Sequence, residues 1–421
     1  MGSYCELKFD ELHIVDAKSA VPDDLVALFQ ESDRVVVEVH ETEEDDARRD
    51  VLYQAPRESI LRRLDLLGYT KTIVRERFTQ WRNDQIESWT EHSQYSEDSD
   101  RETLKALEVF DFTTWCQRAT GLLERQWDLP EPVDEIDRRM RDDDDGWLHF
   151  DGYGSLGTLR ALLDAFPNVK QVTLDITDLI GGGWIDENEP ICSRRREADR
   201  GEVRSLAPTV ILAEGSSDIE ILQSSLASLH PEQKDYFSFF DHRELSVDGG
   251  TSYLVKFLKA FAAARAPLQI IAVFDNDVAG VQAYRQALAL NFPRNISVMT
   301  LPDIKIAEDY PTVGAQGEGT ENVNGRAASI ELYLGRTSLV DAGGSLRPVR
   351  WKGYVHNAFQ GAVEGKADIR AAFLGGLRNV AGAETARNAY PELACVWQAI
   401  FRLTEQSMSA ARRNETRKLL E

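Results

Sequence analysis

The chain lacks the features that mark membrane-spanning and disulfide-stabilised proteins. Its apolar stretches, such as Ala260–Ala264, are far shorter than the roughly 20 residues that a membrane-spanning helix needs. The segment Met1–Asp10 has no apolar core of the kind found in signal peptides. The four cysteines are too far apart to form a CxxC metal or redox pair. We therefore expect a cytoplasmic protein with reduced thiols, no membrane contact and no zinc ribbon.

Positive charge is also scarce. The 48 Lys and Arg stand against 71 Asp and Glu, a formal net charge of −23. By count, residues 1–150 have 37 acids and 19 Lys/Arg (−18), and residues 151–421 have 34 and 29 (−5). This balance argues against passive, non-specific binding of nucleic acid by a basic surface. It leaves open an enzyme in which metal ions neutralise a local acidic site.

Length and aromatic content favour a folded protein of several domains. The chain has 421 residues, which suggests two to four domains, and 8 Trp, 12 Tyr and 17 Phe can fill a sizeable core. Tyr4–His13 and Arg34–His40 have strand-like patterns, and apolar residues recur at helical spacing over residues 57–90 and 102–127. Residues 1–200 are therefore predicted to form a mostly helical module with a small sheet.

The composition then changes to a strand, loop and helix pattern. Residues 205–335 are predicted to form an α/β domain with a parallel sheet, and residues 336–421 a helical C-terminal extension. Residues 311–326 are rich in glycine and are predicted to form a loop.

The first chemical motif follows a predicted buried strand, Thr209–Ala213. Glu214 stands at the end of this strand, and Asp218 lies in the first turn of the helix that follows. Ligands gather at the carboxyl ends of strands in open α/β sheets. Gly215 between them permits a tight turn of the backbone beside the site.

The second motif has the same setting. The apolar run Leu268–Phe274 leads directly into Asp275 and Asp277, and a helix is predicted after them. Two aspartates one residue apart on such a loop can face one pocket. Their hard oxygen ligands suit Mg²⁺ or Mn²⁺.

Together, the E-G-x-x-D motif at Glu214 and the D-x-D motif at Asp275 resemble the TOPRIM domain, the metal-binding α/β unit of topoisomerases, primases and certain nucleases. The resemblance covers about residues 205–335. It implies that these residues form an α/β domain with a TOPRIM-type parallel sheet.

The resemblance implies roles for individual residues. In TOPRIM enzymes the first glutamate acts as general base or acid, or as a metal ligand, which here is Glu214. Nucleases of the OLD type have a further acidic ligand, for which Glu331 fits by its position. They also have a lysine facing the scissile phosphate, for which Lys366 is the candidate and Lys305 and Lys352 are rivals. The implied ligands of Mg²⁺ or Mn²⁺ are Glu214, Asp218, Asp275, Asp277 and Glu331, and the implied catalytic residues are Glu214 and Lys366.

Each candidate also has a purely structural interpretation. Asp218 and Glu331 could be acids that favour the start of a helix, because the helix dipole attracts negative charge there. Asp275 and Asp277 could be turn-forming residues, and Lys366 could be a surface lysine.

The opening stretch Gly2–Leu12 and the order of parts resemble bacterial HEPN/Toprim proteins, in which a helical N-terminal region precedes a nuclease-type TOPRIM domain. HEPN ribonucleases use an Arg followed at a short distance by a His. Arg34 and His40 have that spacing but lie in a strand-like run, so the structural interpretation of this region is favoured over the catalytic one.

The resemblance implies a nuclease more readily than other TOPRIM activities. Few residues remain after the TOPRIM-like part for the tyrosine-bearing domain of a topoisomerase, and no primase core or zinc ribbon is present. No P-loop motif occurs, so a gating ATPase or sensor would be a separate subunit. We expect a nuclease that cleaves DNA, or alternatively RNA, in bacterial anti-phage defence, as a homo-oligomer or as part of a complex.

Two other hypotheses stay open. One is a non-catalytic interaction or sensor subunit of a defence complex that uses the fold to bind a partner or nucleic acid. The other is a Mg²⁺-dependent phosphotransferase of the HAD type, although that family has Thr where this chain has Ala279.

Overall fold

Contacts divide the chain into two units. The computed structural model describes residues 2–39, 48–93, 98–125, 131–141, 146–152, 154–199, 207–240, 250–355 and 358–418. Unit 1 is Met1–Gly201 with Ser409–Glu421, and unit 2 is Glu202–Met408. The boundary between Met408 and Ser409 falls inside helix α16 (Pro391–Lys418). The predicted three-part division at about residues 205 and 335 stays a prediction.

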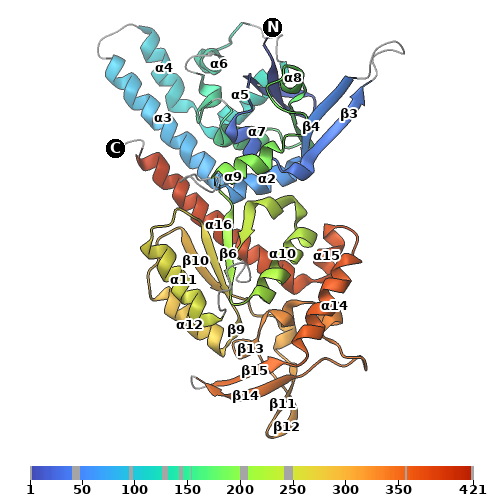
Figure 1. Ribbon diagram of the computed structural model, residues 1–421. Helices are drawn as coiled ribbons and strands as arrows, with labels where there is room; N and C mark the ends of the chain where they lie inside the picture. The colour runs from blue at the N-terminus through green and yellow to red at the C-terminus, as the bar shows by residue number, and fades with distance from the viewer. Residues whose placement is uncertain are drawn as a thin grey trace. The chain divides into compact units, whose positions relative to one another are not determined.

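Unit 1 combines one antiparallel sheet with several helices (Figure 1). The strand order is β2-β1-β5-β4-β3, and neighbouring strands are antiparallel. The strands are β1 (Tyr4–Phe9), β2 (Leu12–Lys18), β3 (Arg34–Val39), β4 (Arg48–Pro56) and β5 (Gln171–Asp175). The helices are α1 (Asp23–Ala27), α2 (Arg57–Leu66), α3 (Lys71–Ser93), α4 (Asp98–Val109), α5 (Phe112–Arg125), α6 (Glu135–Met140), α7 (Leu156–Ala165), α8 (Thr177–Gly181) and α9 (Ile191–Asp199), with 3₁₀ turns η1 (Glu31–Asp33) and η2 (Trp147–His149).

The core of unit 1 is rich in aromatic side chains. Phe78 of α3 contacts Phe110 and Phe150 in edge-to-face geometry. Trp115 is fully buried, and its indole N–H donates to the carbonyl of Trp147 at 2.9 Å. Buried aromatics of this size bury much apolar area, and the hydrogen bond satisfies the indole N–H. These contacts hold the helices of unit 1 together.

Unit 2 is built on a parallel sheet with the strand order β10-β8-β6-β7. All three neighbouring pairs are parallel. The strands are β6 (Thr209–Ala213), β7 (Phe237–Phe239), β8 (Ile270–Phe274) and β10 (Ile296–Thr300). Parallel strands need covering on both faces, which explains why the runs that form β6 and β8 are almost entirely apolar.

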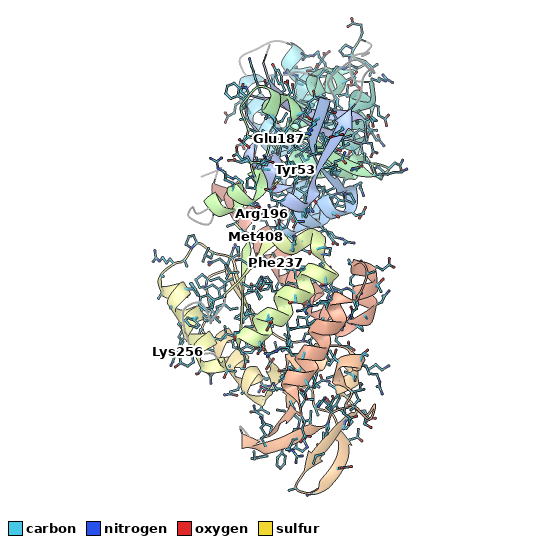
Figure 2. The ribbon with its side chains drawn as sticks, turned by 45° about the vertical axis from the view of Figure 1, so that its right-hand side comes forward. Tyr53, Glu187, Arg196, Phe237, Lys256 and Met408 are labelled. Carbon is cyan, nitrogen blue, oxygen red and sulfur yellow. The ribbon has the colours of Figure 1, made fainter. Side chains whose placement is uncertain are left out.

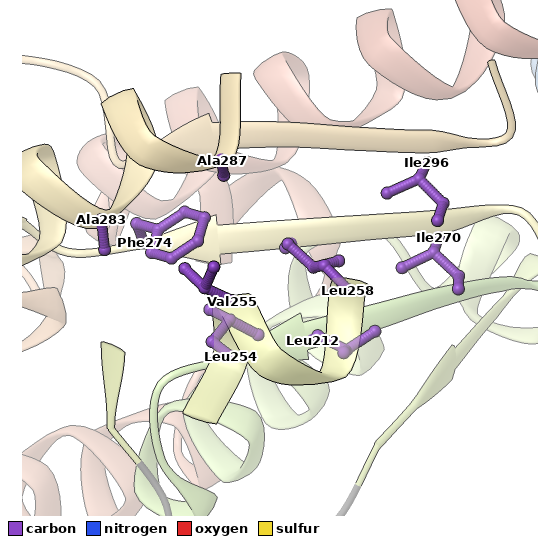
Figure 3. Packing of buried hydrophobic residues seen from close by; sticks show 10 residues of the cluster. Leu212, Leu254, Val255, Leu258, Ile270, Phe274, Ala283, Ala287 and Ile296 are labelled. Carbon is purple, nitrogen blue, oxygen red and sulfur yellow. The ribbon is translucent and has the colours of Figure 1, made fainter. Parts of the chain in front are cut away.

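Helices cover this sheet on its two faces. Figure 3 shows Leu254 and Leu258 of α11 and Ala283 of α12 packed with Leu212 and Phe274 of the sheet. The opposite face carries α10, and Figures 1 and 2 show it apart from α11 and α12. The helices and 3₁₀ turns of this part are α10 (Ser216–Leu229), η3 (Pro231–Tyr236), α11 (Thr251–Ala263), α12 (Val278–Leu288) and η4 (Lys305–Ala307).

The rest of unit 2 adds a second sheet and further helices. This sheet has the order β12-β11-β14-β15, and a small pairing joins β13 to β9. Its strands are β9 (Asn276–Asp277), β11 (Tyr310–Gly314), β12 (Gly317–Glu321), β13 (Ala327–Ala328), β14 (Val349–Val355) and β15 (Ala358–Val363). The helical elements are η5 (Ile330–Tyr333), α13 (Arg336–Leu339), α14 (Lys366–Arg378) and α15 (Ala383–Ala389).

Three predictions about unit 2 are wrong in detail. Residues 311–326, predicted as a loop, contain the β11–β12 hairpin, because Gly317 at φ +100° makes the turn and Thr312 pairs with Gly319. The C-terminal segment, predicted as helical, includes β14 and β15 before its helices. The helix predicted to start near Glu331 is the single 3₁₀ turn η5.

The predicted class of mixed helix and sheet with a parallel sheet is confirmed. In unit 1, strand β4 was missed, and Arg34 lies in β3, as its pattern predicted. His40 lies outside the described residues, so the Arg34–His40 spacing is not tested. Among the helices in the described part of the chain, none combines the length and the apolar character needed to cross a membrane.

Candidate active site

The two acidic loops meet at one edge of the parallel sheet. Strands β6 and β8 are neighbours and parallel, with Ala213 opposite Val273. The residues that follow them, Glu214 and Asp275, therefore emerge side by side. The backbone N–H of Asp275 donates a hydrogen bond to Oε1 of Glu214 at 3.1 Å.

Asp218 caps the helix that follows Glu214. Its Oδ2 accepts from the N–H of Gly215 at 2.9 Å, and its Oδ1 accepts from the hydroxyl of Ser217 at 3.2 Å. Asp218 therefore stabilises the start of the helix, as its structural interpretation predicts. This capping also holds the carboxylate on the side of the loop where Glu214 lies.

Asp277 caps α12 in a similar way. Its Oδ1 accepts from the N–H of Gly280 at 2.8 Å, and its Oδ2 accepts from the side-chain amide of Gln360 at 3.2 Å. A Cβ at Gly280 would lie 2.2 Å from the carbonyl oxygen of Asp275, closer than any real contact. Glycine at this position therefore lets α12 begin directly beside the Asp275–Asp277 loop.

Asn276, between the two aspartates, is buried and stabilises the loop. Its side-chain amide donates to Oδ1 of Asp303 at 2.7 Å and its oxygen accepts from the N–H of Gly325 at 3.0 Å. Asp303 follows β10, the other neighbour of β8, so its position after a strand could have identified it. Nothing in the local sequence around Gly325 or Gln360 predicted their contacts.

Glu331 reaches the same edge through a different connection. Strand β13 pairs antiparallel with β9, placing Ala327 opposite Asp277 and bringing η5 next to the loop. The N–H of Ile330 donates to Oδ1 of Asp275 at 3.1 Å. Glu331 itself is 6% exposed, and its Oε2 accepts from the hydroxyl of Ser329 at 2.6 Å.

Lys366 is the cation that the structure brings to these acids. It is the first residue of α14, after Gly365 in the left-handed conformation at φ +70°. Its Nζ lies 2.8 Å from Oε2 of Glu331 and 3.0 Å from the hydroxyl of Ser329. The rivals Lys305 and Lys352 lie in η4 and β14, and neither has a hydrogen bond to the five acids within the described ranges.

Burial and mutual repulsion raise the pKa values of the acids. Burial, with the charges of Asp277 and Asp218, raises the pKa of Glu214 to about 8 against the opposing backbone hydrogen bond from Asp275. Burial, followed by the charge of Glu331, raises the pKa of Asp218 to about 6. Each carboxylate therefore interacts electrostatically with others of the set.

Burial and neighbouring charges also shift the pKa values of Asp275, Asp277 and Lys366. Burial, with the charges of Asp218 and Glu214, raises the pKa of Asp275 well above its ordinary value. Burial also raises the pKa of Asp277. Burial alone would lower the pKa of Lys366, but the charge of Glu331 and its hydrogen bond raise it. When ionised, the five carboxylates therefore carry more negative charge than the ammonium group of Lys366 neutralises.

The donor set suits a hard divalent cation. Its donors are carboxylate oxygens, the ligands that Mg²⁺ and Mn²⁺ prefer, and their excess charge favours cation binding. Within the described ranges, however, no three His, Cys, Asp or Glu side chains lie at the spacing of a preformed metal site. The hydrogen bonds to backbone N–H groups and to Lys366 orient the carboxylates instead.

Comparison with known proteins adds evidence on the N-terminal part. Residues 1–198 match the family model HEPN/Toprim N-terminal domain 1, which supports a protein of the HEPN/Toprim type. Searches of curated proteins and of solved structures found no match. The matched range ends before Glu214, so the match by itself assigns no role to the acids.

Proposed function

We propose that unit 2 contains a metal-dependent nuclease centre of the TOPRIM type, which hydrolyses phosphodiester bonds. The observation that supports this most directly is the contact of Asp275 with both Glu214 and the N–H of Ile330, beside the Glu331–Lys366 ion pair. It joins three segments far apart in sequence around one set of carboxylates. The match of residues 1–198 to the HEPN/Toprim N-terminal domain suggests a nuclease-related or defence role and adds to the proposal.

The acids would hold Mg²⁺ or Mn²⁺. The proposed ligands are Glu214, Asp218, Asp275, Asp277 and Glu331. When bound, the metal supplies Lewis-acid stabilisation of the phosphate and an activated water.

The chain's own residues would manage protons and position the substrate. Burial raises the pKa of Glu214 to about 8, so this carboxyl can exchange a proton near neutral pH and is the proposed general base or acid. Lys366, with 43% of its side chain exposed, would contact the scissile phosphate, since an ammonium group binds phosphate oxygens as a point charge.

The proposed substrate is DNA, with RNA as the alternative. The biological setting we propose is bacterial anti-phage defence in the cytoplasm, in a homo-oligomer or in a complex with a separate ATPase or sensor subunit. The concentration of negative charge in residues 1–150 would suit a basic partner surface.

One observation favours a second candidate, a non-catalytic interaction or sensor subunit. Each of the five acids accepts a hydrogen bond from the protein, and Glu331 is also neutralised by Lys366. A cluster already satisfied in this way could hold the loops in place without performing catalysis.

The test uses two acid pairs of the same unit. Asp275→Asn/Asp277→Asn removes charges of the proposed centre, and Glu308→Gln/Asp309→Asn removes two exposed acids outside it. Wild type and both variants are incubated with supercoiled plasmid, linear DNA and total tRNA, with Mg²⁺, Mn²⁺ or EDTA. We expect metal-dependent cutting by wild type and the exposed-pair variant, lost in the Asp275/Asp277 variant.

The same samples separate the two candidates. Metal ions are added during thermal unfolding, because a ligand that binds only the folded state raises the melting temperature. A protein that neither cuts any substrate nor gains stability from metal would rule out the nuclease and favour the non-catalytic role.

A further inference from the structure

The hairpin of β14 and β15 exposes aromatic side chains near the acidic cluster. Tyr354 and Phe359 lie opposite each other in the antiparallel pair and are 64% and 52% exposed. Their rings are 5.1 Å apart at 72°, and the ring of Trp351 lies 6.5 Å from that of Phe359. Large aromatics are normally buried, so two of them at adjacent exposed positions indicate a binding surface.

A hydrogen bond and a cation–π contact hold Trp351, the inner residue of this aromatic surface, in place. The indole N–H of Trp351 donates to Oε1 of Glu321 at 2.9 Å, and the guanidinium of Arg326 lies over the Trp351 ring at 4.3 Å. Arg326 in turn is paired with Oε2 of Glu321 at 3.0 Å. The aromatic surface thus begins on a rigid platform, and its outer part, Tyr354 and Phe359, faces solvent.

Two connections place the platform beside the proposed centre. Gln360, the residue after Phe359, donates to Oδ2 of Asp277. The backbone of Arg326 forms a bridge with Asp277, while its side chain covers Trp351. The β14–β15 hairpin is therefore connected directly to the Asp275–Asp277 loop.

The charge of the hairpin differs from that of the rest of the chain. Residues 349–363 contain two cations, Arg350 and Lys352, and no Asp or Glu, in a chain with a net charge of −23. Both cations of β14 are exposed: Lys352 lies between Trp351 and Tyr354, and Arg350, which precedes Trp351, pairs with Glu364. Aromatic rings interleaved with cations bind single-stranded nucleic acid, because bases stack on the rings and cations contact the phosphates.

We infer that the β14–β15 hairpin binds an unpaired stretch of DNA, with bases stacked on Tyr354 and Phe359 and phosphates near Arg350 and Lys352. In a duplex the bases are stacked on one another and their faces are not available to the hairpin. The inference rests on the proposed function, and it specifies the substrate as DNA with a single-stranded end, flap or gap.

Binding is measured without cleavage, by fluorescence anisotropy of a labelled oligothymidylate in EDTA and low salt. Tyr354→Leu/Phe359→Leu keeps much of the apolar area but removes the rings, and we expect it to weaken binding by about tenfold or more. Tyr354→Phe/Phe359→Tyr keeps both rings and should bind as wild type does. Trp184→Ala, which removes an aromatic of unit 1 that is 58% exposed, is the matched control and should also bind normally.

Each outcome decides the inference. Equal binding by the leucine variant and wild type, tighter binding of the matching duplex, or tighter binding of the same sequence as RNA would overturn it. Variants that fail to fold are recognised by circular dichroism, and then Tyr354→Leu and Phe359→Leu are compared singly. If Tyr354→Leu/Phe359→Leu loses binding but wild type cuts no substrate, the inference stands and the nuclease is rejected. If wild type cuts and the leucine variant binds as well as wild type, the nuclease stands and the inference is rejected.

Discussion

The backbone N–H of Asp275 and the carboxylate of Glu214 form a 3.1 Å hydrogen bond across the ends of two neighbouring strands. The two residues are 61 positions apart, and the pairing of β6 with β8 is what joins them. The bond fixes Glu214 where it experiences the charges of Asp218 and Asp277.

The metal-free protein should lose stability as the pH rises. Glu214 has a pKa of about 8 in the folded protein and near its ordinary 4.5 when unfolded, so the folded state holds more protons between these values. The free energy of unfolding therefore falls as the pH rises from about 4.5 to 8. Glu214→Gln should be more stable than wild type at pH 8, by on the order of 1–2 kcal/mol, and similar to it at pH 4.5.

The measurement is chemical denaturation in EDTA at several pH values. Glu308→Gln, an exposed glutamate of the same unit, should follow wild type throughout. If the free energy of unfolding of Glu214→Gln falls between pH 6 and pH 8 as much as that of wild type, Glu214 does not have the raised pKa.

Divalent cations should stabilise the protein above pH 7. Mg²⁺ or Mn²⁺ would compensate for the repulsion among the acids and release protons from Glu214 on binding. We expect a higher melting temperature with metal, an effect larger at pH 8 than at pH 6. The experiment is thermal unfolding with a metal titration, and Asp275→Asn/Asp277→Asn should respond little. A shift of equal size in that variant would place the metal elsewhere.

Lys366→Met should destabilise the protein through Glu331. The Glu331 side chain is 8% exposed, and the change removes its charged partner while Ser329 still donates to it. We expect a loss of about 1–3 kcal/mol, since a buried acceptor loses a hydrogen bond to a charged group. Denaturant unfolding measures it, with Lys305→Met as the exposed control. The double variant Glu331→Leu/Lys366→Met should recover much of the lost stability. A Lys366→Met variant as stable as wild type would show that the ion pair contributes no stability.

Gly280→Ala should disturb the Asp275 loop. The new Cβ would lie 2.2 Å from the carbonyl oxygen of Asp275, so the backbone has to move, at a cost of about 1–3 kcal/mol. Gly375→Ala in α14 is the matched control, because no atom lies within 4 Å of its Cβ; it should stabilise by about 0.5–1 kcal/mol. Thermal unfolding and metal titration compare the two. Normal metal binding by Gly280→Ala would show that the loop tolerates the shift.

The sequence predicted the elements that surround the acids better than the elements that complete the site. Apolar runs identified β6 and β8, because a buried parallel strand is apolar at almost every position. The hairpin β11–β12 was predicted as a loop, since its strand β12 is exposed and rich in glycine. Its pairing with β11 comes from backbone hydrogen bonds, which leave little trace in side-chain pattern.

The acids themselves were predicted from their positions after strands, but their roles as metal ligands stay predictions. Local sequence could not indicate that Ile330 donates to Asp275, or that Gln360 donates to Asp277. These contacts join segments 55 and 83 residues apart. Such pairings depend on chain topology, which periodicity does not encode.

The sequence by itself determined where Glu214, Asp275 and Asp277 lie, because carboxylates directly after apolar strands are at the carboxyl edge of a parallel sheet. Tertiary structure alone decided which of them share an environment and which cation accompanies them. Lys366 reaches Glu331 because α14 begins beside η5, and neither lysine rival does so within the described ranges. Short-range pattern sets the local conformation, whereas burial, repulsion and ion pairing arise only when distant segments pack together.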